Sequence, residues 1–206
     1  MHLETITSKQ KWVFEKLDKF PEFYLVGGTA LALQIGHRIS VDFDLFSKKD
    51  ITLRVLNKVR RIFKGSKIEV IREHSEQLSV TIDRTKVDFV KYPFPLLFKL
   101  IKYQGVSISK ISEIAVMKAY TMGRRETLKD YIDLYYILKE KHVTLEKIIK
   151  LSQKKYKREF NPRLFLEQLI HPEDVQDMQI DFLKKPVTKQ EMEKFFRNEV
   201  KEIIYL

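Results

Sequence analysis

The residues best placed to do chemistry in this sequence are two aspartates, two positions apart. In the run 41–46, apolar and acidic residues alternate, which is typical of a strand with two unlike faces. Asp42 and Asp44 therefore share one face, and Val41, Phe43 and Leu45 share the other. Two acids at this spacing repel each other. If they face a cleft they need a cation, and paired carboxylate oxygens suit Mg²⁺ or Mn²⁺.

A diglycine turn lies upstream of the two acids. The run Val26-Gly27-Gly28-Thr29 follows a short apolar strand, 23–26, and opens a short helix, 29–35. Backbone N–H groups freed by the glycines can bind an anion at the start of this helix. A phosphate-binding turn beside a carboxylate pair is what a nucleoside triphosphate and its metal ion require.

The elements around these two features predict an α+β protein. A helix is expected at 8–19 and another from Thr52 to about residue 63. Strands are expected at 67–72, 77–82 and 86–91, and a further strand or hairpin arm at 96–106. From residue 112 onward the apolar residues follow a helical period almost to the end. We therefore expect an α/β core at 1–110 and a helical region at 111–206.

Composition narrows the class of protein and of site. The 206 residues are 44% apolar and 33% charged, as in soluble globular proteins, and no apolar run is long enough to span a membrane. The first residues show no signal-peptide pattern, so we expect a cytoplasmic protein. Cysteine is absent, and the five histidines are not at metal-ligand spacing. Disulfides and thiolate sites are excluded, zinc is disfavoured, and carboxylates must hold any metal.

The diglycine turn and the acids together resemble a known signature. Gly-Gly-Thr, a short helix and then Arg38-x-Ser40-x-Asp42-x-Asp44 resemble polymerase-β-type nucleotidyltransferases, with threonine where serine is commoner. More narrowly, they resemble the AbiEii/AbiGii-like toxin branch of type IV toxin–antitoxin systems. The resemblance covers roughly residues 20–140 and implies a small mixed sheet flanked by helices. It implies that the acids bind metal and act in catalysis, and that the nucleotide is bound by Gly27, Gly28, Thr29, Arg38 and Ser40.

The resemblance also implies a third metal-binding carboxylate, on a strand that pairs with the acidic strand. Asp88, in the otherwise apolar run 87–90, is at the matching position. From the residues alone, Asp88 is also compatible with a charge that protects an edge strand, with Lys86 on the same face as its partner. Arg38 likewise has two interpretations, a phosphate ligand or an exposed loop arginine.

The second half of the resemblance lies in the helical region. The toxin branch has a lysine, an arginine and two acids, which match Lys118, Arg125, Asp130 and Asp133 here. The resemblance implies that Lys118, Asp130 and Asp133 act in catalysis and that Arg125 binds the nucleotide. In one continuous helix, Lys118, Arg125 and Lys129 would form a basic strip able to bind a triphosphate. The alternative is structural. Asp130 would cap a helix that starts at Thr127, Lys129 would pair with Asp133, and Lys118 would extend from a core helix.

The charge of the chain bears on its partner. The formal net charge is +11, and residues 147–163 contain seven basic residues and one acid. Such a surface favours a polyanion such as RNA, with aromatic side chains available for stacking, although a solvated helix has the same composition.

The expected function is metal-dependent transfer of a nucleotide from an NTP to an acceptor hydroxyl. The acceptor would be tRNA or another RNA, and a cognate antitoxin would be the protein partner. One alternative is a small-molecule or protein acceptor, as in antibiotic-adenylating relatives of this fold. A second is a nucleic-acid-binding module without catalysis.

Overall fold

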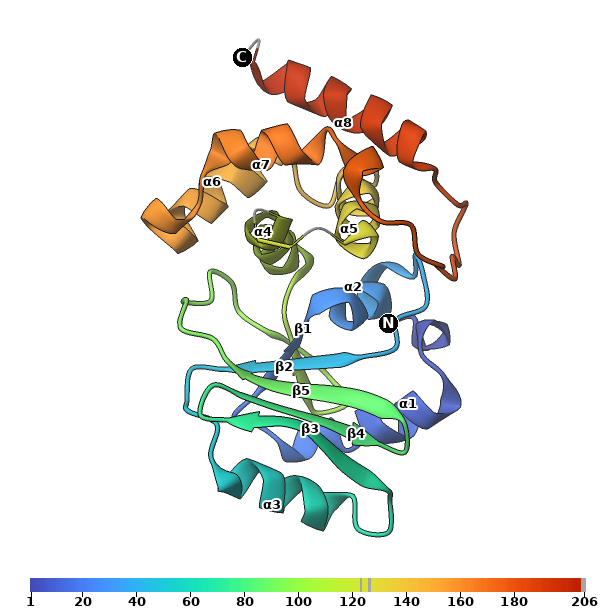
Figure 1. The fold of residues 1–206 in the computed structure, drawn as a ribbon, viewed down its shortest axis with the longest axis vertical. Helices are drawn as coiled ribbons and strands as arrows, with labels where there is room; N and C mark the ends of the chain where they lie inside the picture. Colours follow the sequence, from blue (N-terminus) through green and yellow to red (C-terminus); the bar gives the residue numbers. More distant parts are fainter. Residues whose placement is uncertain (123, 126, 205–206) are drawn as a thin grey trace. The chain divides into compact units, whose positions relative to one another are not determined.

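The computed structural model describes residues 1–122, 124–125 and 127–204. The chain forms two compact units, Met1–Lys110 and Ile111–Leu206 (Figure 1). The boundary lies where strand-type patterning gives way to helical patterning. The architecture is α+β, and no helix among the described residues combines the length and the apolar character that crossing a membrane requires.

A mixed sheet of seven strands organises residues 1–110, all of which the structure describes. Its order is β3-β4-β5-β2-β1-β7-β6. Strand β2 pairs in parallel with β5, and β1 with β7, whereas the other pairs are antiparallel. The strands are β1 (Tyr24–Val26), β2 (Phe43–Ser47), β3 (Ile68–His74), β4 (Gln77–Ile82), β5 (Thr85–Lys91), β6 (Ile101–Tyr103) and β7 (Val106–Ile108).

Helices cover both faces of this sheet. Figure 1 shows α2 (Gly27–Ile35) on one side, and α1 (Ser8–Phe14) and α3 (Leu53–Ile62) on the other. The side of α1 and α3 is the apolar face. Phe43 of β2 lies 6.2 Å from Phe14 between ring centroids, and Phe89 of β5 lies 5.1 Å from Phe20. Side chains alternate along a strand, so the acids of β2 and β5 face the side of α2.

Two predicted elements differ in extent from the structure. The helix expected at 8–19 ends at Phe14, and a 3-10 turn, Leu17–Lys19, follows it. The acidic strand begins at Phe43, and Val41 is 49% exposed. Asp42 therefore precedes the strand. The arm expected at 96–106 corresponds to the hairpin of β6 and β7, whose strands lie at 101–103 and 106–108. Gly36 caps α2 in the left-handed conformation.

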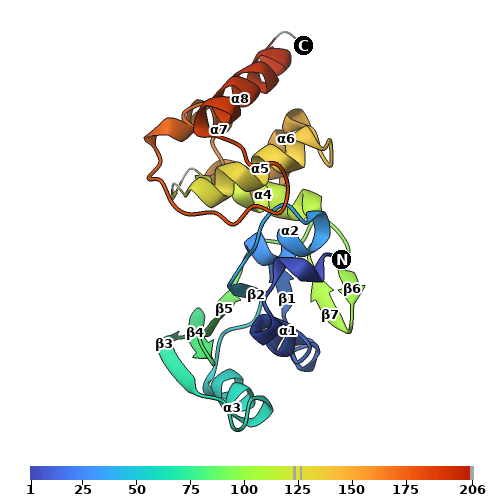
Figure 2. The same cartoon turned by 90° about the vertical axis from the view of Figure 1, so that its right-hand side faces the viewer.

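Residues 111–206 form a helical bundle as far as they are described, and Figure 2 shows its helices from a second side. Helix α6 follows the helical period predicted for this region, and α8 begins with a capping box of Thr188 and Glu191. The helices are α4 (Ile111–Met122), α5 (Leu128–Lys139), α6 (Leu145–Tyr156), α7 (Pro162–Leu169) and α8 (Lys189–Ile204), with short 3-10 turns at Lys157–Glu159 and Pro172–Asp174.

A buried ion pair joins α4 to α6. Lys155 donates to Glu113, and both side chains are almost fully shielded from solvent. Tyr156 is also buried and stacks on Tyr120 at 3.8 Å between ring centroids. Lys155 and Tyr156, two residues of the basic segment 147–163, therefore belong to the core. The exposed basic residues of that stretch are Lys147, Lys150, Lys154, Lys157, Arg158 and Arg163.

Lys155→Met is predicted to destabilise the protein strongly. It leaves the Glu113 carboxylate buried without its cation, which costs about 3–5 kcal/mol. Lys154→Met, at the exposed neighbouring position, is the matched control and is expected to change the free energy of unfolding by about 0.5 kcal/mol or less. Urea denaturation followed by circular dichroism measures both. Equal stability of the two variants would contradict the buried pair.

Candidate active site

Strand register makes Asp44 and Asp88 neighbours. Strands β2 and β5 run in parallel with Asp44 opposite Asp88, and Val26 of β1 lies opposite Asp44 on its other side. Asp88 is buried, whereas Asp42 is partly exposed just before β2. The sheet therefore places two of the three predicted carboxylates at paired positions on adjacent strands. The third precedes Asp44 by two residues.

One cation lies among these carboxylates. The Nζ atom of Lys86 is 2.7 Å from Oδ2 of Asp88. This hydrogen bond raises the pKa of Lys86 despite partial desolvation, and the charges of Asp88, Asp42 and Asp44 raise that pKa further. All three carboxylates thus act on the same ammonium group. The expected pairing of Lys86 with Asp88 is present, but it does not separate Asp88 from the other two acids.

The donor set suits a hard divalent cation. As the side chains stand, no group of three acidic or histidine residues in the described part of the chain is arranged to hold a metal. The Oδ1 atom of Asp88, however, is buried and accepts no hydrogen bond from any described residue. A buried carboxylate oxygen in this state is costly unless a cation or donor reaches it. Oxygen ligands of this kind are those that Mg²⁺ and Mn²⁺ prefer.

The diglycine turn lies directly against the acidic site. A Cβ atom at Gly27 would be only 2.3 Å from Oδ2 of Asp44, and one at Gly28 would be 2.5 Å from Nη2 of Arg38. Gly27 also has a positive φ of 72°. The chain can approach Asp44 and Arg38 this closely only because neither position carries a side chain. The start of α2 and the acids are therefore next to each other.

The connection between α2 and β2 is fixed by buried polar contacts. Thr29 is fully buried, and its hydroxyl donates to the carbonyl oxygen of Asp42 and lies 2.8 Å from Oγ of Ser40. Arg38 is 2% exposed, which rules out the exposed loop arginine, and its Nη1 donates to the carbonyl oxygen of Ile39. These residues hold Asp42 beside the start of α2.

Gln10 is a member of this network that the sequence analysis did not identify. Its Nε2 donates to the carbonyl oxygen of Ser40 at 2.9 Å. The sequence does contain one indication of a role for Gln10. Thr7 and Gln10 have the spacing of a capping box, and the structure contains that box at the start of α1. The sequence alone does not show that the same glutamine reaches a segment thirty residues away.

The second predicted set forms a cluster within the helical unit. Nζ of Lys118 on α4 lies 2.7 Å from Oδ1 of Asp130 and 2.5 Å from Oδ2 of Asp133, and all three side chains are buried. Nε of Arg125 is 3.5 Å from Oδ2 of Asp130. Burial alone would raise the pKa of Asp130, but the charges of Lys118 and Arg125 hold it below its ordinary value. The cluster ties α4 to α5.

The basic strip expected on one continuous helix does not form. Helix α4 ends at Met122 and α5 begins at Leu128, and residues 123 and 126 lie outside the described part. Lys118 is buried between two acids, so it does not share an exposed face with Arg125. Thr127 precedes α5 as expected, but its hydroxyl donates to Oδ2 of Asp130 instead of accepting from the helix backbone.

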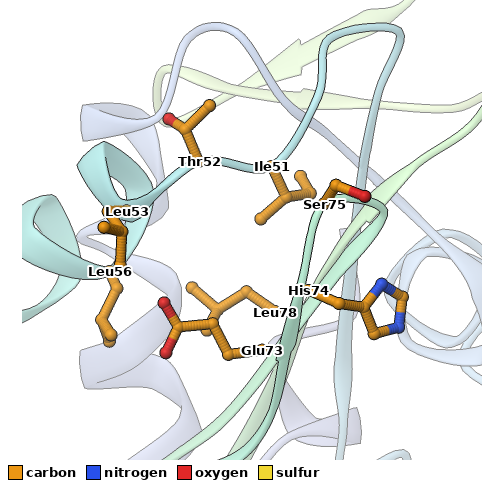
Figure 3. A pocket seen from close by; sticks show the side chains of 8 residues that line it. All are labelled: Ile51, Thr52, Leu53, Leu56, Glu73, His74, Ser75 and Leu78. Carbon is orange, nitrogen blue, oxygen red and sulfur yellow. The ribbon is translucent and has the colours of Figure 1, made fainter.

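A cavity of about 260 Å³ lies elsewhere in the first unit. Glu73 and Leu78 line it from the β3–β4 hairpin, and Leu53 and Leu56 line it from α3 (Figure 3). Leu78 lies on the opposite face of β4 from Ser79, which pairs with Asp88. The cavity and the carboxylates are therefore on opposite faces of the sheet, and the cavity is not the acidic site.

Comparison with known proteins decides the family. The family model for the nucleotidyl transferase AbiEii toxin of type IV toxin–antitoxin systems matches residues 13–206. The chain belongs to the AbiEii family. An uncharacterized protein of Aquifex aeolicus (strain VF5) is 31% identical over 185 residues, which cover 89% of this chain and 88% of that protein. Membership of the AbiEii family makes the chain a nucleotidyltransferase.

Solved structures similar to this AbiEii-family chain agree on the fold. A putative nucleotidyltransferase from H. pylori has a TM-score of 0.58 at 18% identity and covers 99% of this chain and 96% of its own. MenT4, a nucleotidyltransferase toxin from Mycobacterium tuberculosis H37Rv, has a TM-score of 0.56 at 19% identity, over 90% of this chain and 76% of its own. The fold is therefore that of the nucleotidyltransferases.

Gly27→Ala is predicted to impair the site as well as the fold. The added methyl group would clash with the Asp44 carboxylate, so we expect nucleotide transfer to fall by about 10²-fold or more. Gly65→Ala is the matched control, because Gly65 also has a positive φ but nothing within 4 Å of the added atom. Both variants should lose about 1 kcal/mol of unfolding free energy from the backbone alone.

Transfer of label from an α-labelled NTP and urea denaturation distinguish the two effects. Equal activity of the two variants would contradict the close contact between Gly27 and Asp44.

Proposed function

We propose that this chain transfers a nucleoside monophosphate from an NTP to an acceptor hydroxyl with the help of Mg²⁺ or Mn²⁺. The observation that supports it most is the register of β2 and β5, which makes Asp44 and Asp88 neighbours, with Gly27 in contact distance of Asp44. A metal-carboxylate site next to a glycine turn at a helix start is suited to a triphosphate.

The three aspartates would hold the metal. Asp44 and Asp88 would supply oxygens from adjacent strands, and Asp42 from the segment that Thr29 anchors. When bound, the ion neutralises the triphosphate and lowers the pKa of the acceptor hydroxyl. The hydroxyl would lose its proton to solvent and its oxygen would form a bond to the α-phosphorus, while the bond from the α-phosphorus to the bridging β-phosphate oxygen breaks and pyrophosphate leaves.

The residues around the diglycine turn have different roles in this proposal. The N–H groups at Gly27 and Gly28 and the side chains of Arg38 and Ser40 would bind the phosphates. Thr29 would contribute to nucleotide binding indirectly, because its buried hydroxyl is hydrogen-bonded to the segment that carries Asp42. It would orient the site without direct contact with the triphosphate.

The cluster of Lys118, Arg125, Asp130 and Asp133 also contains residues with direct and indirect roles. Arg125 has a side chain that is 67% exposed, so it can offset phosphate charge. Lys118, Asp130 and Asp133 are buried together, and Asp130 contacts Arg125. We assign these three to positioning Arg125 and the ends of α4 and α5 during catalysis.

RNA is the acceptor we favour, with tRNA as its leading example. The support is the set of exposed cations on α6 and the turn after it, which lie on one short segment and could follow a phosphate backbone, namely Lys147, Lys154, Lys157 and Arg158. Family membership in a type IV toxin–antitoxin system supports an antitoxin as protein partner. A small-molecule or protein acceptor would require no such surface, and a non-catalytic module would require no acidic site.

Asp44→Asn and Asp88→Asn are predicted to reduce transfer by about 10²–10³-fold or more, since each removes a carboxylate that would hold the metal ion beside the reacting phosphate. Asp50→Asn is the matched control. Asp50 is an exposed acid paired with Lys91, and its loss should leave transfer unchanged. Purified protein with each α-labelled NTP, Mg²⁺ and total RNA gives the measurement. Transfer by the Asp44 and Asp88 variants at the control rate would refute the assignment.

Replacement of Lys154, Lys157 and Arg158 by glutamine is predicted to raise the KM for RNA. It should also make the plot of the logarithm of the RNA association constant against the logarithm of salt concentration less steep, by about two to three units of slope, since three phosphate contacts are lost. The control changes Arg60, Arg61 and Lys64, three exposed cations at the end of α3, to glutamine. An equal effect of both triples would mean that net charge alone matters. No salt dependence in the unmodified protein would favour a small-molecule acceptor.

A further inference from the structure

Lys86 occupies the position at which the acidic site needs a cation. It lies on β5, one residue before Val87, which pairs with Phe43, and Asp88 follows two residues later opposite Asp44. Lys86 and Asp88 therefore face the same side of the sheet. The side chain of Lys86 is 40% exposed, whereas that of Asp88 is 10% exposed. The ammonium thus approaches the carboxylates from the solvent side and has room to withdraw.

The charges in the site favour one small cation at a time. Three carboxylates lie close together here, and the Lys86 ammonium contacts one of them, Asp88, at 2.7 Å. A divalent ion bound to Asp88 next to that ammonium would meet a like charge at a few ångströms, which costs free energy at a partly buried site. The ammonium also uses Oδ2 of Asp88, one of the two oxygens that an ion could bind.

We infer that Lys86 is an internal counter-ion that competes with the divalent metal for the three carboxylates. This inference rests on the proposed function, and it adds a regulation of that site. Without nucleotide, Lys86 stabilises the empty acidic site and keeps the affinity for metal low. A triphosphate offers the displaced ammonium a new anionic partner, so metal and nucleotide bind together. The site is thereby protected from binding metal unproductively.

Metal binding without nucleotide tests the competition. Mn²⁺ titration followed by electron paramagnetic resonance gives the Kd, and we expect Lys86→Met to bind Mn²⁺ about tenfold more tightly than the unmodified protein. Lys86→Arg retains the charge and should bind as weakly as the unmodified protein. Lys91→Met is the matched control, because Lys91 is on the same strand but pairs with Asp50.

Thermal unfolding supplies a second readout that does not depend on transfer. Without metal, Lys86→Met removes the ammonium that pairs with the buried Asp88 carboxylate, so its Tm should fall, and Mn²⁺ should raise that Tm more than it raises the Tm of the unmodified protein. An unchanged Kd in Lys86→Met would refute the competition alone, provided that Asp44→Asn abolishes Mn²⁺ binding. Absence of Mn²⁺ binding by the unmodified protein and Lys86→Met alike would refute the metal site and the competition together.

Discussion

The parallel pairing of β2 with β5 is the constraint on which the site depends. Opposite Asp44 stands Asp88, and a slip of one residue would turn Asp88 to the other face of the sheet. The apolar residues between the acids prevent that slip. Phe43 and Phe89 are buried on the opposite face of the sheet, against Phe14 and Phe20. The register that keeps both of these ring contacts is the one that places Asp44 opposite Asp88.

The same strands explain how much could be predicted from the sequence. Alternation correctly separates Asp44 from Phe43 and Leu45, because period two is a local property of a strand, but it does not extend to Val41 and Asp42, which precede β2. It cannot show that β5 lies beside β2 in parallel, since β3 and β4 intervene in the chain. That neighbour was predicted from family resemblance. The start of the acidic strand was predicted two residues too early, because Thr29 and Gln10 bond the segment before Phe43.

Burial of cations was the feature hardest to predict. Arg38, Lys118 and Lys155 are basic residues in a chain of net charge +11, and each could equally be exposed on pattern alone. In the structure each is buried, Lys118 between Asp130 and Asp133 and Lys155 against Glu113. The acidic partners of Lys118 and Lys155 lie on other helices, so no local spacing reveals them. The cationic surface is accordingly smaller than composition indicates, and it is clearest around the end of α6.

A crystal structure with Mn²⁺ and a non-hydrolysable NTP analogue would test the central claim most directly, because the anomalous signal of manganese locates the ion without assumptions. The account predicts an ion within about 2.0–2.3 Å of oxygens from Asp44 and Asp88, with Asp42 as a further ligand and the triphosphate at the diglycine turn. An ion and nucleotide bound elsewhere, with Asp88 still held only by Lys86, would contradict it.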